Sequence, residues 1–194
     1  MPMKTIAYLL GFAMIVGCSG AKTYTEQEQQ QYEQLKALVQ SKQLEIHSNF
    51  ARPMTTTAFM QVANSGILGP GNSASNIDIT SNSNLLKIEN DSITGYFPFF
   101  GEQRFAGSYP SSNNQGIEFK GIPEDYKVTE NDDKHSVMIN FKMNDQYRAN
   151  EQYNVFVTVF PNKRSSIQIN STNRTSIEFS GSWQQLKEED NKTQ

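Results

Sequence analysis

The heptapeptide Val-Met-Ile-Asn-Phe-Lys-Met, residues 137–143, decides the fold class of this chain. Apolar side chains recur in it with a period of two, so an extended backbone places them on one face: Val137, Ile139, Phe141 and Met143. The turn-forming residues 131–133, Asn-Asp-Asp, precede the run and separate it from the chain before it. The stretch therefore predicts a β-strand with one buried face.

Similar alternating runs flank this stretch on both sides, with turn residues between them. They predict further strands around Ile117 and Phe119, Tyr126 and Val128, Tyr153 to Val159, Ile167 and Ile169, and Ile177 to Trp183. Short strands at such regular spacing are typical of all-β domains. The sequence predicts a mainly β domain, either an antiparallel β-sandwich or a curved, barrel-like meander.

The first half of the chain carries weaker strand signals and one helix signal. Thr25 and Glu28 have capping-box spacing, and an amphipathic helix is predicted from about Glu26 to Ser41, covering one end of the sheet. A strand with an alternating inner face should follow, then a second strand over 55–62, a brief strand inside a loop and a hairpin around Asn90-Asp91. The inner-face residues of the first of these strands are Leu44, Ile46, Ser48 and Phe50, and the brief strand holds Ile77 and Ile79.

The N-terminus resembles a bacterial lipoprotein signal. Lys4 precedes an uncharged run that is too short for the ~20 apolar residues of a membrane-spanning helix. The run ends in a lipobox-like sequence, Ile15, Val16, Gly17 and Cys18, in which the cysteine thiol takes a diacylglycerol. We expect a signal peptide over 1–17, a lipidated tether over 18–24, one domain over 25–185 and a disordered tail over 186–194.

Several segments together resemble the bacterial lipoprotein family known as domain of unknown function 4251. They are the predicted helix, the strand at 44–50, Tyr96 to Gly101, Gly116 to Phe119, Asp125-Tyr126 and Ile177 to Gly181. The family shows a Leu-Pro-Tyr-Phe-Gly-like segment, and residues 97–101, Phe-Pro-Phe-Phe-Gly, take its place here. The resemblance implies a lipoprotein of the cell envelope of Bacteroidota, without an assigned activity.

Charge and composition exclude several function classes. Removal of residues 1–17 takes away Lys4 and changes the formal net charge from −3 to −4, and no basic run marks a nucleic-acid partner. Cys18 is the only cysteine, and the two histidines, His47 and His135, lack metal-ligand spacing. We expect no metal and no cofactor, and no catalytic motif assigns an enzyme.

An aromatic patch is the best candidate for ligand binding: Tyr96, Phe97, Phe99, Phe100, Phe105 and Tyr109. Rings with a polar handle can stack on sugars or lipids, but the same phenylalanines also fit a hydrophobic core. The sequence leaves open whether the aromatic patch binds a ligand or packs in the core.

Ser92, within Asp91-Ser92-Ile93, resembles the acceptor for O-glycosylation of exported Bacteroidota proteins.

The sequence favours a membrane-anchored lipoprotein of the cell envelope that binds an envelope ligand or protein partner without catalysis. The alternative is an envelope hydrolase that acts on glycan or peptide through residues scattered along the chain. Ser19 after the lipidated cysteine offers no aspartate-type retention signal, which favours the outer membrane over the inner membrane.

Overall fold

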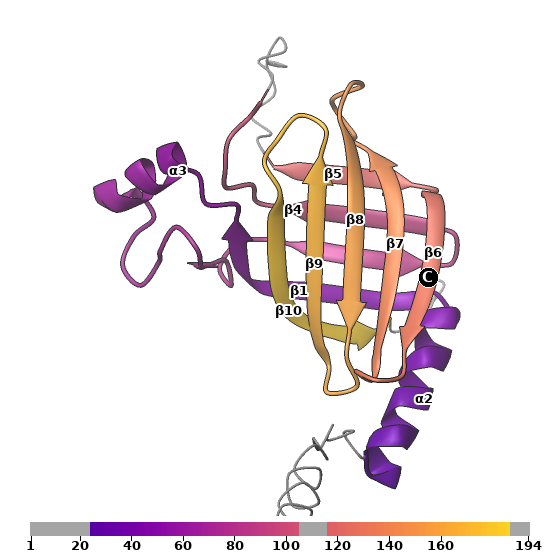
Figure 1. Ribbon diagram of the computed structural model, residues 1–194. Helices are drawn as coiled ribbons and strands as arrows, with labels where there is room; N and C mark the ends of the chain where they lie inside the picture. Colours follow the sequence, from indigo (N-terminus) through magenta and orange to yellow (C-terminus); the bar gives the residue numbers. More distant parts are fainter. Residues whose placement is uncertain (1–23, 105–115, 187–194) are drawn as a thin grey trace, which may run out of the picture.

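The computed structural model describes residues 24–104 and 116–186 and shows one antiparallel sheet with helices at its margins (Figure 1). The elements in chain order are α2 (Glu26–Gln40), β1 (Gln43–Pro53), α3 (Thr57–Val62), the π-helical turn η1 (Ala63–Ile67), β2 (Ile77–Asp78), β3 (Leu85–Glu89), β4 (Ser92–Phe97), β5 (Ile117–Gly121), β6 (Glu124–Asn131), β7 (Ser136–Asn144), β8 (Gln152–Val159), β9 (Arg164–Ser171) and β10 (Ile177–Gln185).

The sheet is a meander with one long-range insertion. Its strands follow the order β5-β4-β3-β1-β10-β9-β8-β7-β6, and β2 pairs with β1 outside this path. Strand β1 lies between β3 and β10, and it pairs with β10 over nearly its whole length, from Leu44 opposite Gln185 to Pro53 opposite Ile177. The first long strand of the chain and its last strand are therefore neighbours at the centre of the sheet.

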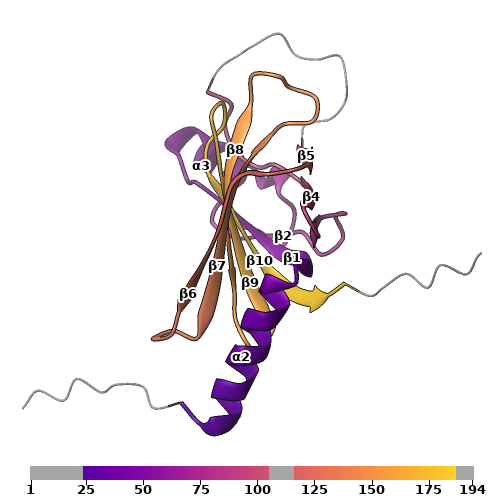
Figure 2. The same ribbon diagram turned by 90° about the vertical axis from the view of Figure 1, so that its right-hand side faces the viewer.

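The sheet curls so strongly that its two halves lie over one another. Figure 1 shows β6 to β9 running up the picture in front of β1, β3, β4 and β5, which run across it, and Figure 2 shows the curl from the side. The concave faces enclose one hydrophobic core, whose largest fully buried side chains include Tyr32, Tyr153, Phe119, Phe141 and Phe179. We call this curled sheet the half-barrel.

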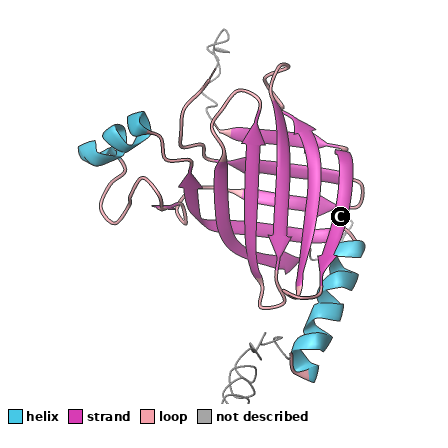
Figure 3. Ribbon diagram, viewed as in Figure 1, coloured by secondary structure: helices cyan, strands magenta, loops and turns pink. Residues whose placement is uncertain are grey.

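The half-barrel confirms the predicted fold class in its curved, meander-like form. Strands dominate the described residues, and the only long helix is the N-terminal one (Figure 3). Alternation of burial follows the predicted faces closely in β7 and β8, where Val137, Ile139, Val155 and Val157 are all buried. In the described part of the chain, no helix is both long and apolar enough to cross a membrane.

Helix α2 begins as predicted and packs against one end of the half-barrel. The Thr25 hydroxyl accepts from the Glu28 amide, and the Glu28 carboxylate accepts from the Thr25 amide at 2.8 Å, which completes a capping box. Its apolar stripe buries Tyr32, Leu35 and Val39 against β1 and β7. The helix thus covers the open end of the core.

A triple stack of rings anchors this helix to the turn between β6 and β7. The His135 ring lies between Tyr24, with centroids 3.4 Å apart, and Tyr32, with centroids 4.7 Å apart. The Tyr32 hydroxyl donates to the Asp132 carboxylate at 3.1 Å, and the Tyr24 hydroxyl donates to the Asp133 carbonyl oxygen. The point at which the chain enters the domain is therefore held against the sheet.

Two details of the first half differ from the sequence prediction. A β-bulge between Ser48 and Phe50 shifts the register of β1, so Phe50 faces solvent and Ala51 takes the buried position. The predicted strand over 55–62 is wrong, because this segment forms α3, whose N-cap Thr56 accepts from the Phe59 amide at 3.1 Å. Local capping outweighed the strand propensity of three consecutive threonines.

The predicted hairpin and the brief strand are confirmed. Strands β3 and β4 pair from Leu85 opposite Tyr96 to Glu89 opposite Ser92, and Asn90 takes a φ of 55° in the turn. Ile77 begins β2, and Ile79 directly after it is fully buried.

Candidate functional site

The structure divides the predicted aromatic patch between the core and its edge. Phe97 is 2% exposed and stacks on Phe179 with ring centroids 4.7 Å apart. Phe99 and Phe100 are half-buried against the core, and Tyr96 lies on the opposite face of β4. Phe105 and Tyr109 lie outside the described residues. Ligand binding by this patch stays a prediction, and it depends on the members other than Phe97.

The segment after Phe97 lies against the connection between β9 and β10. Gly101 adopts a φ of 147°, and a Cβ atom there would come within 2.4 Å of the Thr175 hydroxyl oxygen. Only glycine fits such a position without displacement. The Glu102 amide donates to the same hydroxyl at 3.0 Å, which holds the segment after Phe97 against the connection between β9 and β10. The Phe-Pro-Phe-Phe-Gly segment is therefore a structural closure of this end of the half-barrel.

A buried ionic cluster lies beside this closure. Arg174 Nε lies 2.9 Å from Glu151 Oε1, and the Ser171 hydroxyl donates to the same carboxylate at 2.7 Å. Arg148 lies 3.4 Å from Asp145 Oδ2, and Tyr153 donates its hydroxyl proton to Asp145. Burial, followed by this hydrogen bond to Asp145, raises the pKa of Tyr153. The carboxylates of Glu151 and Asp145 each lie beside an arginine. The cluster therefore links the loop before β8 to the connection between β9 and β10.

The remaining residues singled out from the sequence occupy separate places. Cys18 and the lipobox residues 15–17 lie outside the described residues. Ser92 begins β4 and is half-buried beside Asp91, whose carboxylate lies 2.7 Å from Lys42 Nζ. Its glycosylation stays a prediction.

The two histidines have protein partners instead of converging on one site. His47 Nε2 lies 2.7 Å from Glu45 Oε1 on the outer face of β1, and His135 lies in the ring stack. Among residues 24–104 and 116–186, no group of three or more His, Cys, Asp or Glu side chains is placed to hold a metal ion.

The described surface contains a groove that sequence reasoning missed. It has a volume of about 430 Å³ and crosses the outer face of β1, β10 and β9. Cross-strand pairing explains its shape, since Phe50 lies opposite Ser180, which lies opposite Ser166. Small side chains on two neighbouring strands form a low floor, while Phe50 on one side and Phe160 on the other form the walls. We call this feature the outer groove.

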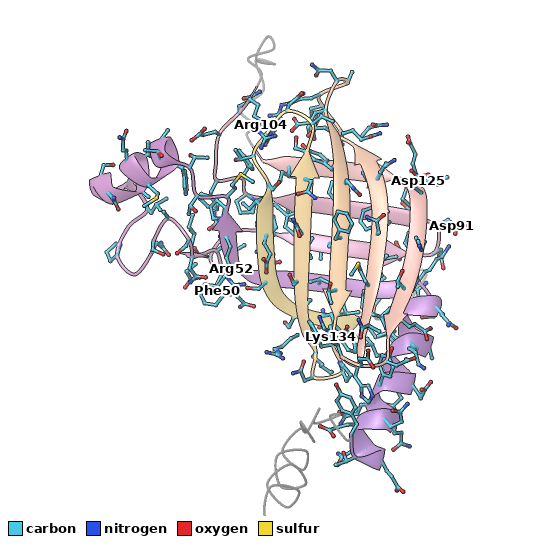
Figure 4. All side chains as sticks on the ribbon, viewed as in Figure 1. Phe50, Arg52, Asp91, Arg104, Asp125 and Lys134 are labelled. Atoms are coloured by element: carbon cyan, nitrogen blue, oxygen red, sulfur yellow. The ribbon has the colours of Figure 1, made fainter. Side chains whose placement is uncertain are left out.

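Gly181 and the bulge of β1 create the outer groove together. A Cβ atom on Gly181 would lie 2.0 Å from the His47 carbonyl oxygen, so β1 and β10 approach too closely there for any side chain. Directly after this contact the bulge turns Phe50 outward, where it is 37% exposed. Figure 4 shows Phe50 and Arg52 together at the same end of β1.

The charges around the outer groove are unequally paired. Arg52 lies 3.3 Å from Glu178 Oε1, which also accepts from the Ser166 hydroxyl at 3.1 Å. The Arg164 guanidinium lies 5.6 Å from the centre of the Phe160 ring, a cation–π contact. Within the described part of the chain, Arg164 makes no ion pair with a carboxylate. The groove therefore presents one arginine that has no acidic partner among the described residues, together with hydroxyl groups and two aromatic walls.

The sequence contained a weak signal for this groove. Residues 165–166, Ser-Ser, and 180–182, Ser-Gly-Ser, interrupt strands that otherwise carry larger outward side chains. The strand pairing that brings both runs together with Phe50 is non-local, so it is invisible to patterns read along the chain.

The fold defines a curled, single-sheet β-domain with a groove on its outer face. A family model, described as a domain of unknown function (DUF4251), matches residues 26–183. The chain belongs to this family, as the resemblance of its motifs predicted. Comparison with curated protein sequences gives no match.

Proposed function

We propose that this protein is a lipid-anchored lipoprotein of the bacterial cell envelope whose half-barrel binds a ligand, without catalysis, in the outer groove. The observation that carries the binding role is the groove itself. Its volume of about 430 Å³ lies in the range of small-molecule sites, and its lining combines two aromatic walls with a few polar groups. The anchoring rests on the lipobox-like residues before Cys18.

The geometry of the N-terminus suits a short tether. Tyr24 is stacked on His135, so the chain is held to the sheet only six residues after Cys18. At about 3.5 Å per extended residue, the tether reaches roughly 20 Å. A cysteine carrying two or more acyl chains stays in the membrane, since each buried methylene contributes about 0.8 kcal/mol. The domain would therefore stand close to the outer membrane surface with α2 nearest to it.

Detergent partitioning of the protein from a bacterial host tests the anchor. Wild-type protein should enter the detergent phase and show the mass of a diacylated, signal-cleaved chain, whereas Cys18→Ser should lack the lipid mass. Ser19→Ala changes the neighbouring residue and leaves the acceptor thiol, so it should behave like the wild type. Wild-type protein that keeps residues 1–17 and carries no lipid would refute the anchoring.

Binding arrays of envelope glycans and peptides test the role of the outer groove. Ser180→Tyr places a large ring on the groove floor, and we expect it to abolish the signals that the wild type gives. Thr94→Tyr is the matched control, because Thr94 lies on the outward face of β4 and pairs with Lys87 and Lys120, neither of which lines the groove. Tyrosine is well tolerated on an outward strand face, so both variants should fold. Equal binding by wild type and Ser180→Tyr would place the function elsewhere.

A further inference from the structure

Arg164 marks the chemical preference of the outer groove. Its guanidinium is held over Phe160, and the Trp183 indole N–H donates to the Phe160 carbonyl oxygen at 2.8 Å, which fixes this wall of the groove. The neighbouring arginine, Arg52, is already paired with Glu178. Arginine offers a planar fork of donors that matches a carboxylate or a phosphate. Because Arg164 has no carboxylate partner among residues 24–104 and 116–186, its guanidinium favours a ligand with one anionic group.

The floor and walls of the groove favour a ring with several hydroxyl groups. The hydroxyls of Ser166 and Ser180 lie on adjacent strands at directly paired positions, between the rings of Phe50 and Phe160. The Ser166 hydroxyl donates its proton to Glu178 and can accept from a sugar, whereas a serine hydroxyl such as that of Ser180 can both donate and accept. Aromatic rings pack against the apolar face of a sugar.

A peptide strand is a poorer occupant than a sugar. The groove lies across β1, β10 and β9, each of which is paired on both sides in the sheet. Peptides that bind by strand addition need a free strand edge for their main-chain hydrogen bonds, and the groove contains none.

We propose that the outer groove binds a saccharide whose pyranose ring carries one anionic substituent, with Arg164 as the residue that recognises the charge. This specificity rests on the binding role proposed above. The ring packs between Phe50 and Phe160, its hydroxyls bond to the serine floor, and its carboxylate or phosphate lies against the Arg164 guanidinium.

Titration with three sugars of the same ring tests the proposal. Glucuronate, glucose 6-phosphate and glucose are added to the full-length protein in detergent micelles, and binding is followed by amide chemical shifts of β1, β9 and β10. At least one of the two anions should bind tenfold or more tightly than glucose. The stronger of the two identifies the source of the charge, an acidic sugar or a sugar phosphate.

Charge variants complete the test. Arg164→Gln should reduce the anion to the affinity of glucose, whereas Arg164→Lys should keep part of the preference. Lys127→Gln removes the same charge from the exposed surface of β6 and should leave the preference intact.

The possible outcomes separate this specificity from the binding role. Equal affinity for glucose and both anions, or a preference that survives Arg164→Gln, overturns the specificity and leaves groove binding standing. If none of the three sugars shifts the groove amides, the specificity is also overturned. The array signals that Ser180→Tyr removes then decide the proposed function separately.

Discussion

At the scale of single residues, the two faces of β4 explain how one aromatic segment is divided between the core and the opposite side of the sheet. Phe97 is buried and stacked on Phe179, while the adjacent Tyr96 points to the opposite side of the strand. Consecutive residues of a strand always face opposite ways, so neighbours in the sequence experience different environments. Residue type alone did not separate these roles.

Alanine substitution at these two positions should give very different losses of stability. Phe97→Ala should lower the free energy of unfolding by about 3–5 kcal/mol, because it leaves a cavity in the core. Tyr96→Ala, the control on the same strand, should lower it by about 1 kcal/mol or less, as typical substitutions away from the core do. Urea unfolding followed by circular dichroism measures both, and equal losses would contradict the observed placement of Phe97.

The ring stack beneath α2 predicts a pH dependence at the alkaline end. Burial, followed by the hydrogen bond to Asp132, raises the pKa of Tyr32 to about 12 from an ordinary value of 10.0. A raised pKa means that the folded state holds the proton more tightly, so the Tyr32 contribution to stability is complete below pH 10 and is lost as pH rises towards 12. Between these pH values, Tyr32→Phe should lose stability less steeply than the wild type, measured by chemical unfolding. Parallel curves for the two proteins would refute the assigned pKa shift.

At the scale of elements, the buried ionic cluster joins β8, β9 and the loops around them. Glu151 begins the chain segment leading into β8, and its carboxylate binds Arg174 from the connection between β9 and β10. The two side chains are 0% and 3% exposed, so neither charge has water as a substitute partner. A buried charge without its partner is costly.

Removing one member of this pair should therefore destabilise the domain strongly. Glu151→Gln should lower the free energy of unfolding by about 3–5 kcal/mol, because the Arg174 charge loses its carboxylate. Glu124→Gln, at an exposed position of β6, is the control and should change it by less than about 0.5 kcal/mol. Thermal unfolding of both variants provides the comparison. A stability close to wild type for Glu151→Gln would show that the cluster does not hold these elements together.

At the scale of the whole molecule, the position of β1 makes the half-barrel a single unit. Because β1 lies between β3 and β10, the N-terminal strands pair with the C-terminal strand at the centre of the sheet. Neither half of the sheet encloses a core without the other. We expect one cooperative unfolding transition, with the same midpoint for backbone circular dichroism and for the fluorescence of Trp183 in β10. Two separate midpoints would show that the halves fold independently.

Much of the architecture was predictable from local patterns. The capping box of α2, the hairpin at Asn90 and the inner faces of β7 and β8 follow from spacing rules that act within a few residues. The family membership also followed from motifs along the chain. Phe50 and the segment 55–62 were predicted wrongly, because a bulge and a capping hydroxyl each overrode the local pattern.

The outer groove, by contrast, was decided by the tertiary structure alone. Its floor requires Ser166 and Ser180 to be paired, and its wall requires the bulge beside Gly181 to turn Phe50 outward. Ser166 and Ser180 pair within the hairpin of β9 and β10, but Phe50 lies 130 positions before its partner Ser180, and no periodicity along the chain encodes that contact. The sequence by itself determined the β class and most of the individual strands, since these depend on local chemistry. Only the pairing of β1 with β10 decided which outward side chains meet, because these two strands lie far apart in the sequence.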